Sequence, residues 1–389
     1  MYLLITFGGG KVQADDTNLK ELTIIQDINK FLPEFRLRIT DSSGLLTHIV
    51  PSDKNTGKVY IELAQDQNDQ KTKNAWNFLV YSKTPEGDQS NPSTVHDIDG
   101  LLDIDGLFSK DESRGFSGTV SSTINTVANE LTNINSKDIS ASLFRTKNLL
   151  QPTWTNAQFL KYLKENLVGG AGEYGFKCFI KTEKHRNIFT FKSISEMIKN
   201  RPYYKFILSS YQNQDQYPIY NYYVYDNYKL YGTFASKKQG YSYFDYENST
   251  FIQDNESITD YKVLSDYYLV DTSDSDDSNS IDNTGRSNGF TSDFAGYVKG
   301  SYGNRVNNLV KMWITTQGLA NIVPGRVVRV FFPQDAVDIY NYQYSGDWLV
   351  ERVVHNIGGS MFLTKLLLTR AGIDTDKTTT LLPASFSLF

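Results

Sequence analysis

The alternation of apolar and polar residues is clearest between residues 309 and 372, where it predicts four antiparallel strands. We expect these strands at residues 309–316, 326–332, 348–355 and 361–370. In the second strand, Val328, Val330 and Phe332 share one face, because alternate side chains of a strand point the same way. The pattern therefore predicts a four-stranded unit with at least one buried apolar face.

Turn residues border the strands of this unit. Pro324 and Gly325 break the chain before the second strand, since proline has no N–H to donate and glycine tolerates the turn. Gly358 and Gly359 supply positive φ cheaply and predict a hairpin. In the strand before that hairpin, we expect Trp348, Val350 and Val354 on one face and Leu349, Glu351, Val353 and His355 on the other.

Short apolar stretches separated by turns predict an all-β region over residues 1–112. The expected strands lie at residues 1–7, 22–25, 35–39, 45–50, 59–63 and 76–81, with a weaker one within 96–108. Residues 1–7 lack a basic leader and a cleavage site, so we expect a first strand there and not a secretion signal. Short strands at this spacing are typical of a small barrel or sandwich.

The periodicity becomes helical after Ser117, and residues 113–201 predict a separate α+β lobe. Apolar residues recur at helical spacing at Val120, Ile124, Val127 and Leu131. A second helix is expected after Thr155, which has Gln158 three residues on and so forms a capping box. The buried face of that helix is expected to hold Phe159, Leu160, Leu163 and Leu167. Segments 174–181 and 187–192 predict a hairpin.

The remaining residues suggest one split unit and two loop-rich segments. Residues 202–235 are strand-like and rich in tyrosine, and we group them with residues 305–372 as a second β-domain. Residues 236–304 form a loop-rich insertion between the two halves. Residues 373–389 are polar at first and end in an apolar stretch, so we expect a C-terminal docking strap.

Composition supports an ordered β-rich protein and narrows the function classes. Aromatic residues make up 14% of the 389 residues, and a net charge of −5 argues against a protein that binds nucleic acid by neutralising phosphates. Cys178 is the single cysteine, which excludes an intramolecular disulfide and a multi-cysteine metal site. No apolar run approaches the ~18 residues of a membrane span. We therefore expect no membrane insertion, no sequence-specific nucleic-acid binding, and assembly in a host cytoplasm.

The candidate chemical motifs favour structural roles. The acid-rich segment 271–283 lacks the glycine and final glutamate of an EF-hand, which favours a solvated loop over a calcium site. His355 has no serine, cysteine or carboxylate partner at a telling spacing, and His48, His96 and His185 form no ligand cluster. We expect no catalytic residue, no cofactor and no metal.

Two further motifs leave alternatives open. The tyrosines of 217–225 could form a sugar-stacking platform, although an interface or core role is favoured because tyrosine has an apolar ring and a polar tip. The expected interface residues are Tyr220, Tyr222, Tyr223, Tyr225 and Phe389. Asp103 and Asp105 alternate on one expected strand face, whereas a glycosidase needs a carboxylate pair across a cleft.

Two sequence blocks resemble the baseplate central hub protein of contractile-tailed bacteriophages, of the T-even type. They cover residues 152–180 and 318–369, and residues 216–225 give a weaker third match. The residues that mark this likeness to the fold are Trp154, Thr155, Gln158, Pro324, Gly325, Gly346, Trp348 and His355. The resemblance rests on the joint order of these blocks, since none of the motifs is chemically unique.

The resemblance implies a mainly β (α+β) fold with two tail-tube-like β-barrels, a smaller α+β lobe and a loop-rich insertion. It further implies a non-enzymatic virion protein of the tail baseplate, in which a homotrimer joins a hexameric tail tube to a trimeric central spike by symmetry adaptation. The implied partners are the tail tube protein, the central spike protein, baseplate wedge proteins and, as a further candidate, the tape measure protein.

Two alternatives to the hub function stay open. One is a carbohydrate-binding or carbohydrate-cleaving β-rich tail accessory protein. The other is the hub of a phage-tail-derived injection particle. A hub of the VgrG type would carry a spike on the same chain, and no repeat-rich β-helix is evident here, so a spike would be a separate protein.

Overall fold

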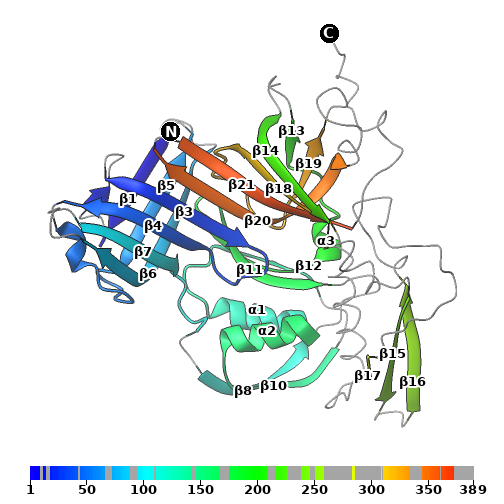
Figure 1. The fold of residues 1–389 in the computed structure, drawn as a ribbon. Coiled ribbons are helices and arrows are strands. Elements are labelled where there is room, and N and C mark those ends of the chain that lie inside the picture. Colours follow the sequence, from blue (N-terminus) through cyan, green and yellow to red (C-terminus); the bar gives the residue numbers. More distant parts are fainter. Residues whose placement is uncertain are drawn as a thin grey trace.

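The computed structural model has a mainly β fold (Figure 1). It describes residues 1–8, 12–14, 18–42, 44–65, 72–87, 94–108, 111–141, 145–166, 175–208, 216–226, 238–245, 250–257, 283–284, 308, 310–332, 344–359 and 361–371. One sheet of 13 strands runs through two barrel-like units, and three smaller sheets accompany it. Residues 271–282 of the predicted acid-rich loop lie outside the described residues, and so does Phe389.

The N-terminal unit is an antiparallel sheet in the order β3-β4-β7-β6-β5-β1-β2. Its strands are β1 (Tyr2–Phe7), β2 (Val12–Ala14), β3 (Leu19–Asp27), β4 (Glu34–Asp41), β5 (Lys58–Ala64), β6 (Asn74–Glu86) and β7 (Thr94–Leu102). In β4, buried and more exposed residues alternate along the whole strand, as expected for a sheet with one face on a core. Five of the predicted strands are thereby confirmed, and the weaker one corresponds to β7.

The strand predicted at residues 45–50 is wrong, because Leu45–His48 form a short 3-10 helix, η1. Its first turn starts from Gly44 at a φ of 72°, and the Asp41 carboxylate accepts a hydrogen bond from the Leu46 N–H at 2.8 Å. At its other end, Lys83 Nζ donates to the carbonyls of Leu46, Thr47 and Ile49 at 2.9–3.3 Å. Side chains from neighbouring segments thus override the strand preference of this apolar stretch.

The second unit is a closed barrel of six strands. The strands are β13 (Tyr204–Ile207), β14 (Tyr217–Asp226), β18 (Val310–Gln317), β19 (Val327–Phe331), β20 (Gly346–Gly358) and β21 (Met361–Arg370). Their order is β19-β13-β14-β18-β21-β20, and pairing of β20 with β19 closes the ring. The four predicted strands of residues 309–372 are confirmed as β18 to β21.

One predicted face of β20 is wrong. Trp348, Val350 and Val353 are completely buried, whereas Val354 lies on the outer face beside Arg352. The reason is a β-bulge between Val350 and Arg352 in the pairing with β21, which inserts one residue and reverses the alternation beyond it. His355 consequently joins the buried face.

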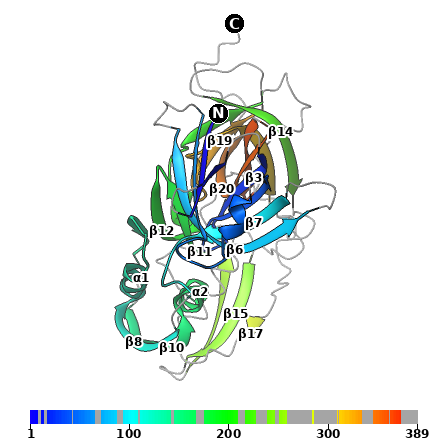
Figure 2. The same cartoon turned by 90° about the vertical axis from the view of Figure 1, so that its left-hand side faces the viewer.

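The α+β lobe extends from the barrel strands, and its helices α1 and α2 and strands β8 and β10 lie below them in both views (Figure 1 and Figure 2). It contains β8 (Asp111–Thr119), α1 (Val120–Asn129), β9 (Ser136–Ile139), β10 (Arg145–Thr155), α2 (Asn156–Asn166), β11 (Phe176–Glu183), β12 (Arg186–Ser193) and α3 (Ile194–Met197). Strands β8 and β10 form a ribbon, and β11-β12-β9 form a three-stranded sheet. A separate sheet contains β15 (Lys238–Asp245), β16 (Thr250–Ser257) and β17 (Asn283–Thr284).

Local signals in this lobe are confirmed. The Thr155 N–H donates to Gln158 Oε1 at 2.9 Å, and the Gln158 N–H donates to Thr155 Oγ1 at 3.2 Å, which is the predicted capping box. The predicted hairpin joins β11 to β12 through Lys184 and His185, which both have positive φ. Two-residue hairpin loops favour this conformation because it matches the strand twist.

Two apolar clusters hold the units together. One joins the N-terminal sheet to α1, α2 and β11, and the other fills the closed barrel and includes α3. Phe179 of β11 belongs to the second cluster, while its neighbours Cys178 and Ile180 belong to the first. Complete burial of a large apolar side chain contributes about 1.5–3 kcal/mol, so this lobe strand stabilises both units.

Candidate assembly site: the joint between two matching units

The two barrel-like units meet where β20 changes its pairing partner. Gly346 to Leu349 pair with β19, and Arg352 to Ile357 pair with β3 of the N-terminal unit. The change happens at the bulge: the Gly325 N–H donates to the Val350 carbonyl at 2.8 Å, and the Ile28 N–H donates to the Glu351 carbonyl at 3.1 Å. The two units are therefore joined strand edge to strand edge, as β20 and β3 lie in Figure 1.

Charged side chains reinforce this joint. Arg352 Nε lies 2.6 Å from Asp27 Oδ2, and the Asp27 side chain is only 1% exposed. Lys311 Nζ lies 2.7 Å from Glu351 Oε2. Asn29 links the two pairs, because its backbone N–H donates to Asp27 and its side chain donates to Glu351. Removing one partner of a buried pair leaves an uncompensated charge, so the Arg352–Asp27 pair, which crosses the joint, favours the joined arrangement. Lys311 and Glu351 both belong to the second unit, and Asn29 ties their pair to the first.

A third element, β11 of the lobe, enters the same network. Lys177 Nζ donates to Asn29 Oδ1 at 2.9 Å. Burial lowers the pKa of Lys177 to about 8, and Lys164 adds to this effect, while Glu351 and Asp27 oppose it. The lobe is thus attached to the joint by a cation as well as by apolar contacts.

Asn74 connects the lobe and both barrel units through hydrogen bonds. Its Nδ2 donates to the carbonyls of Thr182 and Ala320, both at 2.9 Å, and its Oδ1 accepts from the His185 N–H at 2.9 Å. Gln26 adds a bond, since its Oε1 accepts from the Thr182 N–H at 2.9 Å. Asn74 and Gln26 are completely buried, and a buried polar atom without a hydrogen bond is costly, so these bonds stabilise the contact between the units.

His355 lies inside the core beside the joint. Its Nδ1 is 3.2 Å from Thr364 Oγ1, which itself accepts from the Leu319 N–H, so the threonine hydroxyl is free to donate to the histidine. The His355 ring packs against Trp76 and Phe362, with ring centres 5.8 Å away in each case. Burial lowers the pKa of His355 to about 3. Its surroundings are those of a neutral structural histidine.

The other residues of the hub resemblance mostly hold local structure. Trp154 precedes α2 and packs against Tyr162, with ring centres 5.6 Å apart. Gly325 and Gly346 have positive φ at the start of β19 and β20. Trp348 is completely buried under the Arg370 guanidinium, 4.2 Å from its ring centre. These residues are dispersed over the fold and meet at no common surface.

The predicted interface tyrosines lie on β14. A bulge at Tyr220 shifts the alternation, so that Tyr220 and Tyr223 are exposed while Tyr222 packs on the core beside Phe332. The side chain of Tyr225 lies outside the described part, although its backbone pairs with Lys311. The sequence predicts that these tyrosines share one strand. It does not reveal the bulge, which determines which of them are exposed and which pack on the core.

The aspartates and the histidine considered for enzymatic roles do not come together in one catalytic site. Asp103 and Asp105 lie beyond the end of β7 and not on a strand face, and each pairs with a lysine, Lys58 at 3.2 Å and Lys54 at 2.7 Å. His96 is buried near Asp41, with burial lowering its pKa. Within the described ranges, no group of three His, Cys, Asp or Glu residues could hold a metal ion, and no helix is long and apolar enough to cross a membrane.

The two units repeat one strand topology. Strands β3, β4, β5, β6 and β7 correspond in chain order to β14, β18, β19, β20 and β21. In both sets the first strand pairs with the second, the second with the fifth, the fifth with the fourth and the fourth with the third, always antiparallel. Each unit begins with a further strand that precedes these five, and here the two units differ. Strand β1 runs antiparallel to β5, whereas β13 runs parallel to β19.

The correspondence extends to the irregular residues. Bulges lie at Lys20 in β3 and at Tyr220 in β14, and again at Tyr81 in β6 and at Glu351 in β20. Strands β6 and β20 are both 13 residues long. Since bulges are specific features that fix register, their coincidence aligns the two units residue by residue.

A short sequence repeat accompanies this match. Residues 49–52 read Ile-Val-Pro-Ser and residues 322–325 read Ile-Val-Pro-Gly. Ser52 and Gly325 both have positive φ, at 64° and 79°, and their N–H groups donate to the equivalent carbonyls of Val80 and Val350. A comparison of the two Pro-containing turns would have exposed the repeat.

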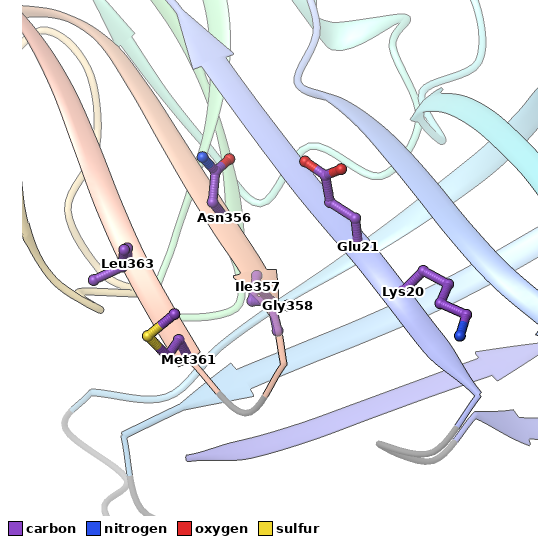
Figure 3. Close-up of a pocket in the computed structure, with 7 residues that line it drawn as sticks. All are labelled: Lys20, Glu21, Asn356, Ile357, Gly358, Met361 and Leu363. Atoms are coloured by element: carbon purple, nitrogen blue, oxygen red, sulfur yellow. The ribbon is translucent and has the colours of Figure 1, made fainter.

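A groove of about 250 Å³ lies beside the joint (Figure 3). Its lining residues are Lys20, Glu21, Asn356, Ile357, Gly358, Met361 and Leu363. Asn356 of β20 and Glu21 of β3 come from the two neighbouring strands, which are paired here, and Thr23 donates to Asn356 Oδ1 at 3.3 Å. The groove follows the seam between the two units, so it belongs to the joint.

Solved structures with the same fold come from phage tails and a secretion system. The chain matches a tail protein from Neisseria meningitidis MC58 with a TM-score of 0.58, 9% identity and coverage of 94% of this chain and 95% of that one. It matches the 43 kDa tail protein of prophage MuSo2 from Shewanella oneidensis with a TM-score of 0.61, 10% identity and coverage of 95% and 98%.

A third match is the E. coli c3393 protein, described as a component of the type VI secretion system with structural similarity to T4 bacteriophage tail proteins gp27 and gp5. The TM-score is 0.54 at 8% identity, over 95% of this chain and 77% of that one. No protein-family model and no curated protein sequence matches the chain. These likenesses concern the fold, and they confirm the predicted mainly β fold class with tail-protein architecture.

Proposed function

We propose that this protein is a structural, non-enzymatic component of a tail baseplate, in which it forms a homotrimeric central hub. The observation that carries the proposal is the joint: one chain contains two units of matching topology, joined side by side through β3 and β20. A chain built this way offers two similar surfaces where a single-unit protein offers one. Three copies around an axis would therefore present six similar positions to a hexameric tube and three identical ones to a trimeric spike.

The proposed partners follow from that geometry and from the sequence resemblance. They are the tail tube protein, the central spike protein, baseplate wedge proteins and the tape measure protein. The proposed location is the tail baseplate of a virion assembled in a host cytoplasm. The likeness in fold to tail proteins from two bacterial genomes supports this assignment.

A second candidate is the hub of a phage-tail-derived injection particle. The likeness to the E. coli c3393 protein favours it, because that protein is described as a component of the type VI secretion system and not of a virion. In both candidates the chain has the same structural role, which is to join a tube to a spike. They differ in whether the assembled particle contains a genome.

The test is the mass and shape of the purified full chain, alone and mixed with its own tube and spike proteins. We expect a particle of three times 44.2 kDa, measured by light scattering, and a ring in projection images. A chain that stays monomeric at micromolar concentration and binds neither tube nor spike would overturn the proposal. Turnover of a glycan, or specific capture on a glycan array, would favour the carbohydrate alternative instead.

A further inference from the structure

A lysine, an asparagine and a glutamate side chain meet in a row beside the joint. Lys177 Nζ of β11 donates to Asn29 Oδ1 at 2.9 Å, and Asn29 Nδ2 donates to Glu351 Oε1 at 3.0 Å. The amide of Asn29 therefore lies between a primary amine and a carboxylate. These are the groups that an amide exchange needs: a nucleophile, an acyl group with a leaving amine, and a carrier for the proton.

The fold holds the amine and the amide together through separate contacts. The Asn29 N–H donates to Asp27 Oδ1 at 2.7 Å, which fixes the turn after β3. In the same turn, the Phe31 carbonyl accepts from the Ile180 N–H of β11 at 2.8 Å. The turn and the strand that contains Lys177 are thus joined by backbone as well as by side chains. Groups kept in contact in this way react far faster than the same groups free in solution.

Glu351 is positioned at the nitrogen that would leave. Its side chain is buried, and Lys311 Nζ lies 2.7 Å from Oε2. Lys311 therefore holds one carboxylate oxygen, while the other accepts from the Asn29 amide. Asn29 itself is exposed, so a small product can escape to solvent.

The surroundings of Lys177 favour the uncharged amine, which is the nucleophilic form. The charged side chains of this site come from α2, β3, β18 and β20, and they are Lys164, Asp27, Lys311, Glu351 and Arg352. Burial lowers the pKa of Lys177 to about 8, Lys164 and Lys311 add to this effect, and Glu351 and Asp27 oppose it. About half of the amine is consequently uncharged near pH 8.

We propose that Lys177 and Asn29 form an isopeptide bond in the folded chain, with Glu351 as the proton carrier. The Lys177 Nζ lone pair attacks Asn29 Cγ, and a new Nζ–Cγ bond forms. A proton from Nζ passes through Glu351 to Asn29 Nδ2. The Cγ–Nδ2 bond then breaks, its electron pair leaves with the nitrogen as ammonia, and the Cγ=Oδ1 double bond is restored. The carboxylate of Glu351 ends unchanged, and no other reactant is consumed.

The bond would join two parts of the fold that are 148 positions apart in the chain. One end lies in the turn after β3 of the N-terminal unit, and the other lies in β11 of the lobe. Closing so long a loop restricts the unfolded chain. The linked form should therefore resist unfolding better than a variant that cannot form the bond, and the lobe would be covalently fixed to the joint.

The chain contains a natural comparison. Lys137 also donates to an asparagine, at Asn129 Oδ1. In the part of the chain that the structure describes, no carboxylate accepts from the Asn129 amide, so this pair lacks a proton carrier at the leaving nitrogen. We expect a bond between residues 29 and 177 and none between residues 129 and 137.

The mass of the natural full chain tests the proposal. The chain is purified at pH 6, where the amine is charged, and then transferred to pH 9. We expect a loss of about 17 Da, the mass of one ammonia, and a branched tryptic peptide that contains Lys177 and Asn29. The rate should rise about tenfold from pH 7 to pH 9, with the fraction of uncharged amine. A branched peptide already present at pH 6 shows that the bond forms during expression, and it supports the proposal equally.

Three variants control this experiment. Lys177→Arg keeps a cation but removes the nucleophile, and Asn29→Ala removes the acyl group at an exposed turn position. Both should keep their full mass. Glu351→Gln keeps the size of the side chain but cannot carry the proton, and it should form the bond at least a hundredfold more slowly. Circular dichroism verifies that each variant is folded.

Full mass without a branched peptide after prolonged incubation at pH 9 would overturn the proposal. A gain of about 1 Da at Asn29 would also overturn it, because water and not Lys177 would then be the nucleophile. If Lys177→Arg loses ammonia as the natural chain does, Asn29 reacts with its own backbone and the assignment is wrong. None of these results affects the hub function, which the mass and shape of the assembly test separately.

Discussion

At the scale of single residues, the joint depends on polar side chains that are completely buried. His355 is the clearest case, because it lies in the core with Trp76 and Phe362 against its ring and Thr364 as its hydrogen-bond partner. The sequence predicted a structural role from the lack of catalytic neighbours. It could not predict complete burial, because burial follows from the bulge that turned this face inward.

We predict that His355 makes stability depend on pH. Its pKa is lowered to about 3 in the folded protein from the ordinary 6.5, so the unfolded chain binds one more proton between those values. Stability should therefore fall as pH drops from 6.5 toward 3, by up to about 1.4 kcal/mol per pH unit from this residue. Urea unfolding at several pH values measures the slope.

The variant His355→Phe should flatten that dependence, although it also leaves the Thr364 hydroxyl without its histidine partner. The matched control is His185→Phe at the exposed hairpin tip, which retains His355 and should keep the slope. An unchanged slope in His355→Phe would contradict the assignment.

At the scale of elements, local sequence signals predict the structure correctly where the interacting residues are close together in the sequence. The capping box of Thr155 and Gln158 and the hairpin at Lys184 and His185 are examples. Local signals gave the wrong structure where other segments of the chain determine the conformation. Residues 45–50 look like a strand, but Asp41 and Lys83 hold them as a 3-10 turn. The outer face of β20 was misassigned because one extra residue shifts its alternation.

The turn before β19 gives a prediction at this scale. Gly325 has a φ of 79°, and a Cβ there would lie 3.0 Å from the Phe179 ring. Gly325→Ala should therefore destabilise the fold by about 1–3 kcal/mol, from backbone strain and from displacement of Phe179. Thermal or urea unfolding measures the loss.

Gly359→Ala is the matched control, because Gly359 also has positive φ but a Cβ there meets nothing within 4 Å. It should cost less than Gly325→Ala. The reverse change at the corresponding turn, Ser52→Gly, relieves a positive φ of 64° and should not destabilise. Equal losses at Gly325 and Gly359 would show that packing against Phe179 is unimportant.

At the scale of the whole molecule, one sheet continues through both units. Composition and strand spacing predicted a β-rich chain, and the order of the sequence blocks predicted two barrels. The edge-to-edge contact of β3 with β20 was not predictable, because strands more than 300 residues apart carry no local signal of pairing. The short Ile-Val-Pro repeat at residues 49–51 and 322–324 is the one local sign of the matching units noted in the sequence.

Continuity of the sheet predicts cooperative unfolding of the two units. We expect one main heat-capacity peak for the natural chain. Arg352→Ala leaves the Asp27 carboxylate buried without its cation and should lower the melting temperature by several degrees, through a loss of about 1–3 kcal/mol.

A double variant controls for loss of the arginine stem. Asp27→Asn combined with Arg352→Ala removes both charges and should recover part of the loss. A natural chain that melts in two well-separated steps, or an Arg352→Ala variant with unchanged melting, would contradict the role given to the joint.

The covalent link between the matching units has a consequence for how a ring would form. In a ring of six separate units, every contact is diluted equally as the protein concentration falls. Here half of the neighbours would already be tethered, so their meeting depends on an effective concentration set by the chain and not by the solution. Assembly of the proposed ring from three molecules would then follow the third power of concentration and not the sixth, so a complete ring would form at a lower protein concentration.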